Sequence, residues 1–227
     1  MLWITGAPGS GKTTLIKELV FGAKVQDSID LNKWPLQKVG TRTQLVWHAS
    51  ADGRVAVAGA YAYPNSPLFP KHRRGTAPPN GGTDTLQPQS VGLLASLLRG
   101  ELPACGRTPE LVVVEACAKQ KVGGPLVRDA MRAAARLHVY ELHVPADEAV
   151  ARLRARDHSH DGKGVKGESA EAVHAKYALQ VQEMLEHVHT GEYAHVPELC
   201  RGCSAEELRE HLSSSADGAA VMQSLSL

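Results

Sequence analysis

Short apolar runs along the chain alternate with segments in which apolar residues recur every three or four positions. Three runs of the first kind, Leu2–Thr5, Leu111–Val114 and His138–Val144, predict β-strands. The run Leu111–Val114 contains no polar residue, which is typical of a strand buried on both faces of a parallel sheet.

The remaining elements follow from the same patterns. Gln44–His48 and Arg54–Tyr61 are two further β-like runs, and the Asp52-Gly53 pair between them predicts a hairpin turn. The helical spacing of apolar residues predicts helices over Lys12–Phe21, Asp84–Arg99, Pro125–Leu137, Asp147–Arg156, Ala170–His189 and Ala205–Leu212. Strands that alternate with helices predict an α/β fold, with a mainly parallel sheet and helices on both of its faces.

The length of 227 residues suits one α/β domain, which we expect over residues 1–212. Residues 62–83 are rich in Pro and Gly and carry the basic cluster Lys71-His72-Arg73-Arg74. A loop of this length inside a compact domain is usually functional or disordered. From Ser213 onward the sequence is rich in Ser and Ala without a clear period, so we expect residues 213–227 to form a disordered tail.

Charge and hydropathy narrow the classes of function. The chain has 25 Lys and Arg against 24 Asp and Glu, a net charge of +1, whereas a dedicated duplex-DNA binder usually has a basic excess. No apolar run is long enough to span a membrane, and no signal peptide precedes the first predicted strand. We therefore expect an intracellular, cytoplasmic protein without a membrane partner.

The four cysteines are expected to be thiols in that compartment. Cys200 and Cys203 form one C-x-x-C, and His187, His189 and His195 precede it. A zinc site and a reduced, partly buried pair of thiols are both open, although a strong zinc signature has two such pairs.

One motif carries most of the functional argument. The segment Gly6-Ala7-Pro8-Gly9-Ser10-Gly11-Lys12-Thr13 fits the pattern G-x-x-x-x-G-K-[ST] at every position. It stands between a predicted strand and an amphipathic helix, which is the context that a phosphate-binding P-loop requires.

Backbone N–H groups of the loop and the start of the helix would hold the phosphates of ATP. Lys12 would reach the β- and γ-phosphates and the Thr13 hydroxyl would bind Mg²⁺, with Thr14 as a neighbour that is not a second metal ligand. The motif implies a three-layer P-loop NTPase fold.

Glu115 follows the apolar run Leu111–Val114 directly. An acid at the carboxyl end of a buried strand lies where ligands bind in a doubly wound sheet. Glu115 could hold Mg²⁺ through water, accept the proton of an attacking hydroxyl, or simply end the strand.

The segment from His143-Val144-Pro145 to Arg156 resembles the part of adenylate-kinase-type nucleotide kinases that precedes the lid. The resemblance implies that Arg152 stacks on the adenine and that Arg156 contacts the transferring phosphates. It also implies a mobile lid at about residues 157–168. Arg152 and Arg156 share one face of a helix at i, i+4, and a guanidinium suits both tasks because it is planar and permanently charged.

A second resemblance concerns the phosphate acceptor. The run Val55–Tyr61 and the later Gly81-Gly82-Thr83-Asp84 are similar to segments of phage-type P-loop kinases, some of which act on 5-hydroxymethyl pyrimidines in DNA. The resemblance implies an acceptor loop at about residues 62–90, with Asp84 as an acceptor-side carboxylate, although Asp84 fits equally well as a helix N-cap. Ala116-Cys117 stands after Glu115, where that group often has Gly-Asp.

These observations predict an ATP- and Mg²⁺-dependent kinase that transfers the γ-phosphate to a hydroxyl acceptor. The acceptor could be a 5-hydroxymethyl pyrimidine in DNA, with Lys71, Arg73 and Arg74 against the backbone phosphates, or a small molecule, nucleoside or nucleotide. A nucleotide-driven switch and a nucleotide-binding protein without chemistry are the alternatives. A GTPase is disfavoured because Asn32-Lys33-Trp34-Pro35 lacks the Asp of a guanine-specifying motif.

Overall fold

The structure is a computed structural model. It describes residues 1–23, 29–39, 45–59, 61, 92–102, 106–115, 129–158, 169–191, 197–214 and 216–225. For residues 156–158 and 216–217 it describes the backbone alone. Within these residues the chain forms one sheet and the helices that cover it.

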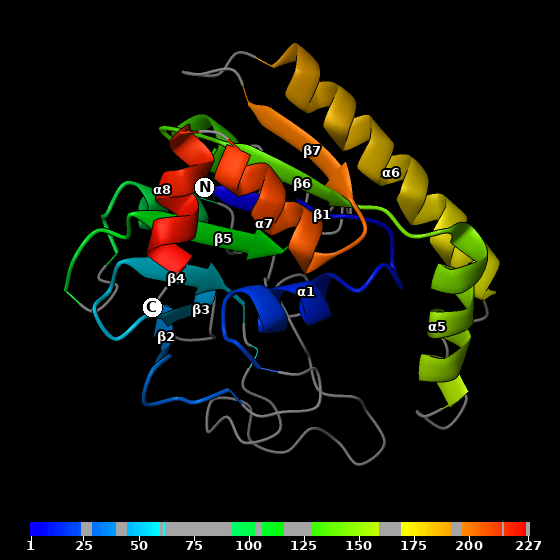
Figure 1. Ribbon diagram of the computed structural model, residues 1–227, viewed down its shortest axis with the longest axis horizontal. Helices are drawn as coiled ribbons and strands as arrows, with labels where there is room; N and C mark the ends of the chain where they lie inside the picture. Colours follow the sequence, from blue (N-terminus) through cyan, green and yellow to red (C-terminus); the bar gives the residue numbers. More distant parts are fainter. Residues whose placement is uncertain are drawn as a thin grey trace.

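A seven-stranded sheet in the order β2-β3-β4-β5-β1-β6-β7 forms the centre of the fold (Figure 1). The strands from β4 to β7 in this order pair in parallel, and β2-β3-β4 pair antiparallel, so the sheet is mixed and mostly parallel. The strands are β1 Leu2–Thr5, β2 Leu36–Val39, β3 Leu45–Ala49, β4 Val55–Ala58, β5 Leu111–Glu115, β6 His138–Leu142 and β7 Glu198–Gly202.

Helices cover both faces of this sheet. They are α1 Lys12–Leu19, α3 Leu93–Leu98, α5 Ala146–His158, α6 Ala170–Thr190, α7 Ala205–Ser214 and α8 Ala216–Leu225, and residues 129–133 are also helical. Alternation along β1 shows how the faces separate: Leu2 and Ile4 join the core under α1, α7 and α8, whereas Trp3 joins the core under α3 and α6. Figure 1 shows α7 and α8 together over one face of the sheet. The α/β prediction is confirmed, and the arrangement is consistent with three layers.

The hairpin prediction is also confirmed, since β3 and β4 pair antiparallel around Asp52 and Gly53. The sequence did not predict β2 and β7, which form the two edges of the sheet. Edge strands are only half covered, and accordingly most residues of both strands are of intermediate burial. Because they lack an unbroken or strictly alternating apolar pattern, their sequences do not read as strands.

The prediction of a disordered tail after Ser213 is wrong for the residues that the structure describes. Helix α7 continues to Ser214, and α8 spans Ala216–Leu225. Val221 is buried in the core beside α1, and Gly218 approaches Leu212 so closely that an added Cβ would lie 2.1 Å from the Leu212 carbonyl oxygen. Small residues on α8 thus permit close packing of the helix against α7. The same small residues led to the prediction of a disordered tail, because their composition resembles that of a disordered segment.

The other predicted helices are present with shifted ends. The α6 prediction agrees to within one residue, while the helix predicted over Pro125–Leu137 is helical at 129–133 and ends before Leu137. Helix α5 continues to His158, two residues into the segment predicted as a lid, and 159–168 lie outside the described residues. No helix in the described part of the chain is long and apolar enough to cross a membrane.

Candidate functional site

The candidate site lies at the carboxyl end of β1, between its two parallel neighbours β5 and β6. After β1 the chain forms β2 to β5, which lie on one side of β1, and then β6 and β7, which lie on the other side. In open α/β sheets, ligands bind in the crevice at such a reversal of strand order. The segment from Gly6 to Gly11 occupies this crevice and leads directly into α1.

The glycines at positions 6 and 9 have a structural reason. Gly9 has a φ of 84°, and a Cβ there would lie 2.3 Å from the Ala149 carbonyl oxygen of α5. A Cβ on Gly6 would lie 2.5 Å from the Leu142 carbonyl oxygen at the end of β6. Both positions therefore require glycine, and the loop is held closely between β6 and α5.

The start of α1 presents backbone donors without acceptors. Ser10 N–H donates to Ala7 O at 3.2 Å, and Leu15 N–H to Gly11 O at 2.9 Å. Within the part of the chain that the structure describes, the N–H groups of Gly11, Lys12 and Thr13 donate no hydrogen bond. The first turn of α1 contains no acidic residue and no side-chain cap. No side chain of the helix itself therefore compensates its partial positive charge, and an anion would be stabilised there.

Lys12 places a buried cation beside these donors. Its side chain is folded back onto the loop, where Nζ donates to the carbonyl oxygens of Gly6 and Ala7, each at 3.0 Å. The residue is 7% exposed, and its described partners are neutral carbonyls. An ammonium has three donors and prefers a charged acceptor when it is buried, so an anion in the loop would gain a strong contact.

Thr13 in the first turn of α1 contacts Glu115 at the end of β5. The Thr13 hydroxyl donates to the Glu115 carboxylate, with distances of 3.0 Å to Oε1 and 3.1 Å to Oε2. The sheet register explains the meeting, because Glu115 pairs with Ile4 two residues before the loop begins. Glu115 is only 5% exposed, and its Oε2 also accepts a hydrogen bond from the Tyr61 hydroxyl at 3.1 Å.

Helix α5 reaches over the loop. Arg152 Nη1 donates to the carbonyl oxygens of Gly9 and Ser10, each at 3.3 Å, and Nη2 forms a 2.5 Å ion pair with Glu148. Arg154 pairs instead with Glu171 of α6. Among the described side chains of α5, only Arg152 brings a guanidinium to the loop.

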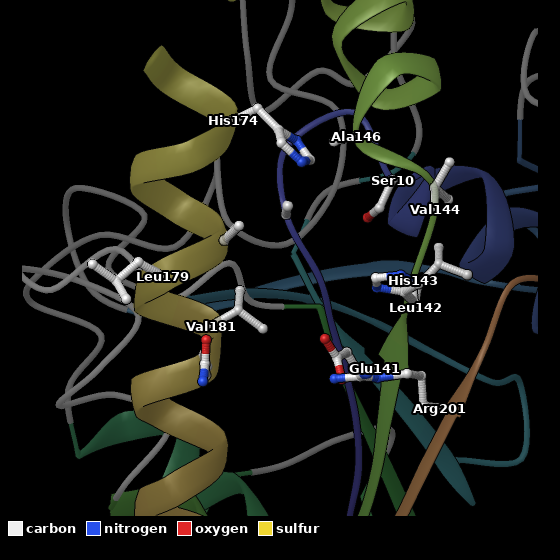
Figure 2. Close-up of a pocket in the computed structure, with 13 residues that line it drawn as sticks. Ser10, Glu141, Leu142, His143, Val144, Ala146, His174, Leu179, Val181 and Arg201 are labelled. Atoms are coloured by element: carbon white, nitrogen blue, oxygen red, sulfur yellow. The ribbon is translucent and has the colours of Figure 1, made fainter. Parts of the chain in front are cut away.

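A cavity of about 550 Å³ adjoins the other side of the loop, between α6 and the carboxyl end of β6 (Figure 2). Ala7 and Ser10 form its wall on the loop side, and Glu141 and Arg201 form an ion pair at 2.6 Å on its far side. His174 of α6 donates from Nδ1 to Pro8 O at 3.2 Å, which ties α6 to the loop. Neither this tie nor the Tyr61 contact was predicted, since no sequence pattern reports a contact between distant segments.

Several predicted site residues lie outside this description. Asp84 and the cluster Lys71–Arg74 are outside the described residues, and of Arg156 only the helical backbone is described. The Cys203 thiol contacts Glu207 Oε1 at 3.2 Å, and this carboxylate raises the pKa of Cys203. The described residues contain no cluster of three or more His, Cys, Asp or Glu that could hold a metal ion.

The structure thus brings Lys12, Thr13, Glu115 and Arg152 together at one loop, and the roles assigned to them stay predictions. Thr14 lies in the first turn of α1, partly exposed. Comparison of the chain with protein-family models, curated proteins and solved structures gave no match. The interpretation of the site therefore rests on its sequence motif and its geometry.

Proposed function

We propose that this protein is an ATP-dependent kinase whose P-loop is the segment Gly6–Thr13. The single observation that carries the proposal is the contact of Thr13 with Glu115 beside a loop of free N–H donors and a buried lysine. The motif alone could arise by chance. A carboxylate from another strand, Glu115, that contacts the motif's threonine is a second and independent feature of a nucleotide site.

The loop supplies what a triphosphate needs. The N–H groups of Gly11, Lys12 and Thr13 donate to none of the described residues, so they would be available to a phosphate at the start of α1. The Lys12 ammonium lies 3.0 Å from neutral carbonyls, and a phosphate would compete successfully with them. In this proposal Lys12 exchanges the Gly6 and Ala7 carbonyls for phosphate oxygens when ATP binds. The loop backbone itself need not move, because β6 and α5 already enclose it.

The residues fit a magnesium site. Mg²⁺ takes oxygen ligands, and Thr13 and Glu115 offer a hydroxyl and a carboxylate in contact with each other. The bound ion would neutralise negative charge on the β- and γ-phosphates. Both carboxylate oxygens of Glu115 lie within hydrogen-bonding range of the Thr13 hydroxyl. This contact supports a role of Glu115 in holding the metal over the alternative role as general base.

Helix α5 supplies further positive charge. Arg152 already contacts the loop through Gly9 and Ser10, so a small rotation of its side chain would bring it to a bound nucleotide. Arg156 lies one turn further along α5, and by its resemblance to lid arginines it would contact the transferring phosphates. A guanidinium at this place would stabilise the charge that develops during transfer.

The acceptor is proposed to be a hydroxyl group, with a 5-hydroxymethyl pyrimidine in DNA as one candidate and a small molecule, nucleoside or nucleotide as the other. The DNA candidate depends on Thr83-Asp84 and Lys71–Arg74. It also requires a single-stranded or flipped base. The net charge of +1 is the observation that favours a small acceptor.

A transfer screen tests the proposal. The protein is incubated with Mg²⁺ and ATP labelled at the γ-phosphate, together with nucleosides, nucleotides, small alcohols, unmodified DNA or DNA that contains 5-hydroxymethyl pyrimidines. A kinase labels one acceptor class and consumes ATP faster when that class is present. ATP hydrolysis that no acceptor accelerates would support a nucleotide-driven switch, and nucleotide binding without turnover would support a binding protein.

A further inference from the structure

Glu115 has a second hydroxyl donor that does not belong to the loop. The Tyr61 hydroxyl donates to Oε2 at 3.1 Å, on the same carboxylate that accepts from Thr13. A carboxylate with 5% exposure needs such donors, because burial without hydrogen bonds would favour its neutral form. Tyr61 itself has no exposed surface. The Tyr61 hydroxyl therefore acts from within the core, through its hydrogen bond to Glu115.

The backbone of Tyr61 is fixed by a buried histidine. The Tyr61 N–H donates to His48 Nε2 at 3.0 Å, so Nε2 is an acceptor and carries no proton. The proton of the neutral imidazole is then on Nδ1, which donates to the Trp34 carbonyl oxygen at 3.0 Å. Both ring nitrogens of His48 are thus used, and they connect Tyr61 to strand β3 and to the segment before β2.

Aromatic packing fixes the same group of rings. Phe21, just after α1, has its ring centroid 5.0 Å from Trp34, 5.5 Å from His48 and 5.4 Å from Tyr61. A ring packed on several sides cannot swing away from its hydrogen-bond partner without opening a cavity. The Tyr61 hydroxyl is therefore held at a defined place relative to the end of β5.

We propose that Tyr61 is a positioning residue, which orients the Glu115 carboxylate toward Thr13 and keeps it ready for Mg²⁺. The inference rests on the proposed function and deepens it. Thr13 would bind the metal and also contacts Glu115, whereas the Tyr61 hydroxyl contacts Glu115 from within the core and its residue is anchored through His48 and Phe21. Through Tyr61 and Phe21, Glu115 is connected to the C-terminal end of α1, the helix that starts in the loop.

The test is a Mg²⁺ titration of Tyr61→Phe. Binding of a fluorescent ATP analogue is measured as a function of Mg²⁺ concentration, so the readout does not depend on transfer. The variant keeps the ring packing and removes one hydrogen bond to a charged group. We expect the Mg²⁺ concentration for half-maximal binding to rise by about tenfold, while binding without Mg²⁺ stays the same.

Tyr140→Phe is the matched control. Tyr140 is also buried, and its hydroxyl donates to the Ser204 carbonyl oxygen at 2.8 Å, just before α7. This variant loses a comparable hydrogen bond and is expected to keep the Mg²⁺ dependence of the wild type. Should Tyr61→Phe fail to fold, His48→Gln takes its place, because it disturbs the acceptor of the Tyr61 N–H and leaves the hydroxyl present. It is expected to shift the Mg²⁺ dependence in the same direction.

The outcomes separate the two claims. Wild-type protein that binds the nucleotide in a Mg²⁺-dependent way, together with an unchanged Tyr61→Phe variant, would overturn the positioning role and leave the proposed function intact. Equal shifts in Tyr61→Phe and Tyr140→Phe would also overturn it, because the effect would then be one of general stability. Wild-type protein that binds no nucleotide would overturn the proposed function and this inference with it.

Discussion

Among single residues outside the loop, Glu115 has the largest part in the proposed site. It is a buried acid at the end of β5 with hydroxyl donors from two other parts of the chain, Thr13 and Tyr61. These hydrogen bonds satisfy the buried carboxylate and fix its orientation beside the loop. Its negative charge, and not its shape, is what the proposed magnesium site uses.

Glu115→Gln keeps the shape and removes that charge. We expect the rate of phosphate transfer to fall by about 10²-fold or more at saturating ATP, the scale seen when a charged catalytic group is neutralised. The rate is measured with labelled ATP and the acceptor that the screen identifies. Glu110→Gln is the control, since Glu110 is an exposed acid before the same strand that pairs with Arg54 and Arg107. Equal rates for the wild type and Glu115→Gln would return Glu115 to a structural role.

His48 gives a prediction for stability and pH. Burial lowers the pKa of His48 from 6.5 to about 4, and the Trp34 carbonyl only partly offsets this. Between these two values the unfolded chain binds a proton that the folded chain does not, so acid favours unfolding. We expect this group alone to lower the free energy of unfolding by about 2 kcal/mol between pH 7.5 and pH 5.

Urea unfolding at the two pH values measures the effect. His48→Gln is expected to be less stable at pH 7.5 and to lose most of this pH dependence, because glutamine does not titrate. A variant with the same pH dependence as the wild type would show that other groups cause it. In that case the neutral, doubly bonded state of His48 would be wrong.

At the scale of elements, the buried strands and the long helices could be predicted from the sequence because their patterns are strong. The apolar run of β5 and the helical spacing of α6 leave few alternatives. The sequence did not predict the edge strands β2 and β7 or the close-packed helix α8. Half-exposed strands and small residues give no clear periodicity of apolar positions. Likewise the loop and Glu115 follow from local sequence, whereas the Tyr61 contact depends on how β4 and β5 pair.

Helix α5 offers a comparison between two arginines on one element. Arg152→Ala is expected to weaken ATP binding several-fold, because Arg152 contacts the loop at Gly9 and Ser10. Arg154→Ala, which removes an exposed pair with Glu171, is expected to leave binding unchanged. Titration calorimetry of both variants gives the answer. Equal and small effects would mean that α5 is only a solvated helix next to the loop.

At the scale of the whole molecule, the chain continues to build the core well beyond α7. Val221 of α8 joins the same cluster as Leu15 and Ile16 of α1, so the end of the chain supports the helix that starts in the loop. A disordered tail would have no such link. The candidate site and the last helix are therefore parts of one packed unit.

Truncation after Ser214 tests this link. Removal of α8 exposes the apolar surface of α1 and α7, and we expect the free energy of unfolding to fall by about 3 kcal/mol, the scale of one or two buried aliphatic side chains. Chemical unfolding of the full chain and the truncated chain measures it. Identical unfolding midpoints would show that α8 contributes nothing to the core.

If the loop Gly6–Thr13 binds ATP for phosphate transfer, Lys12→Ala must stop that transfer. Lys12 contacts only loop carbonyls among the described residues, so its loss should leave the fold intact while it removes the cation for the phosphates. Lys38→Ala, which alters an exposed lysine on the edge strand β2, is the matched control. Transfer of labelled γ-phosphate is predicted to be abolished in Lys12→Ala and unchanged in Lys38→Ala. Undiminished transfer by a well-folded Lys12→Ala variant would show that the loop does not bind the phosphates that are transferred.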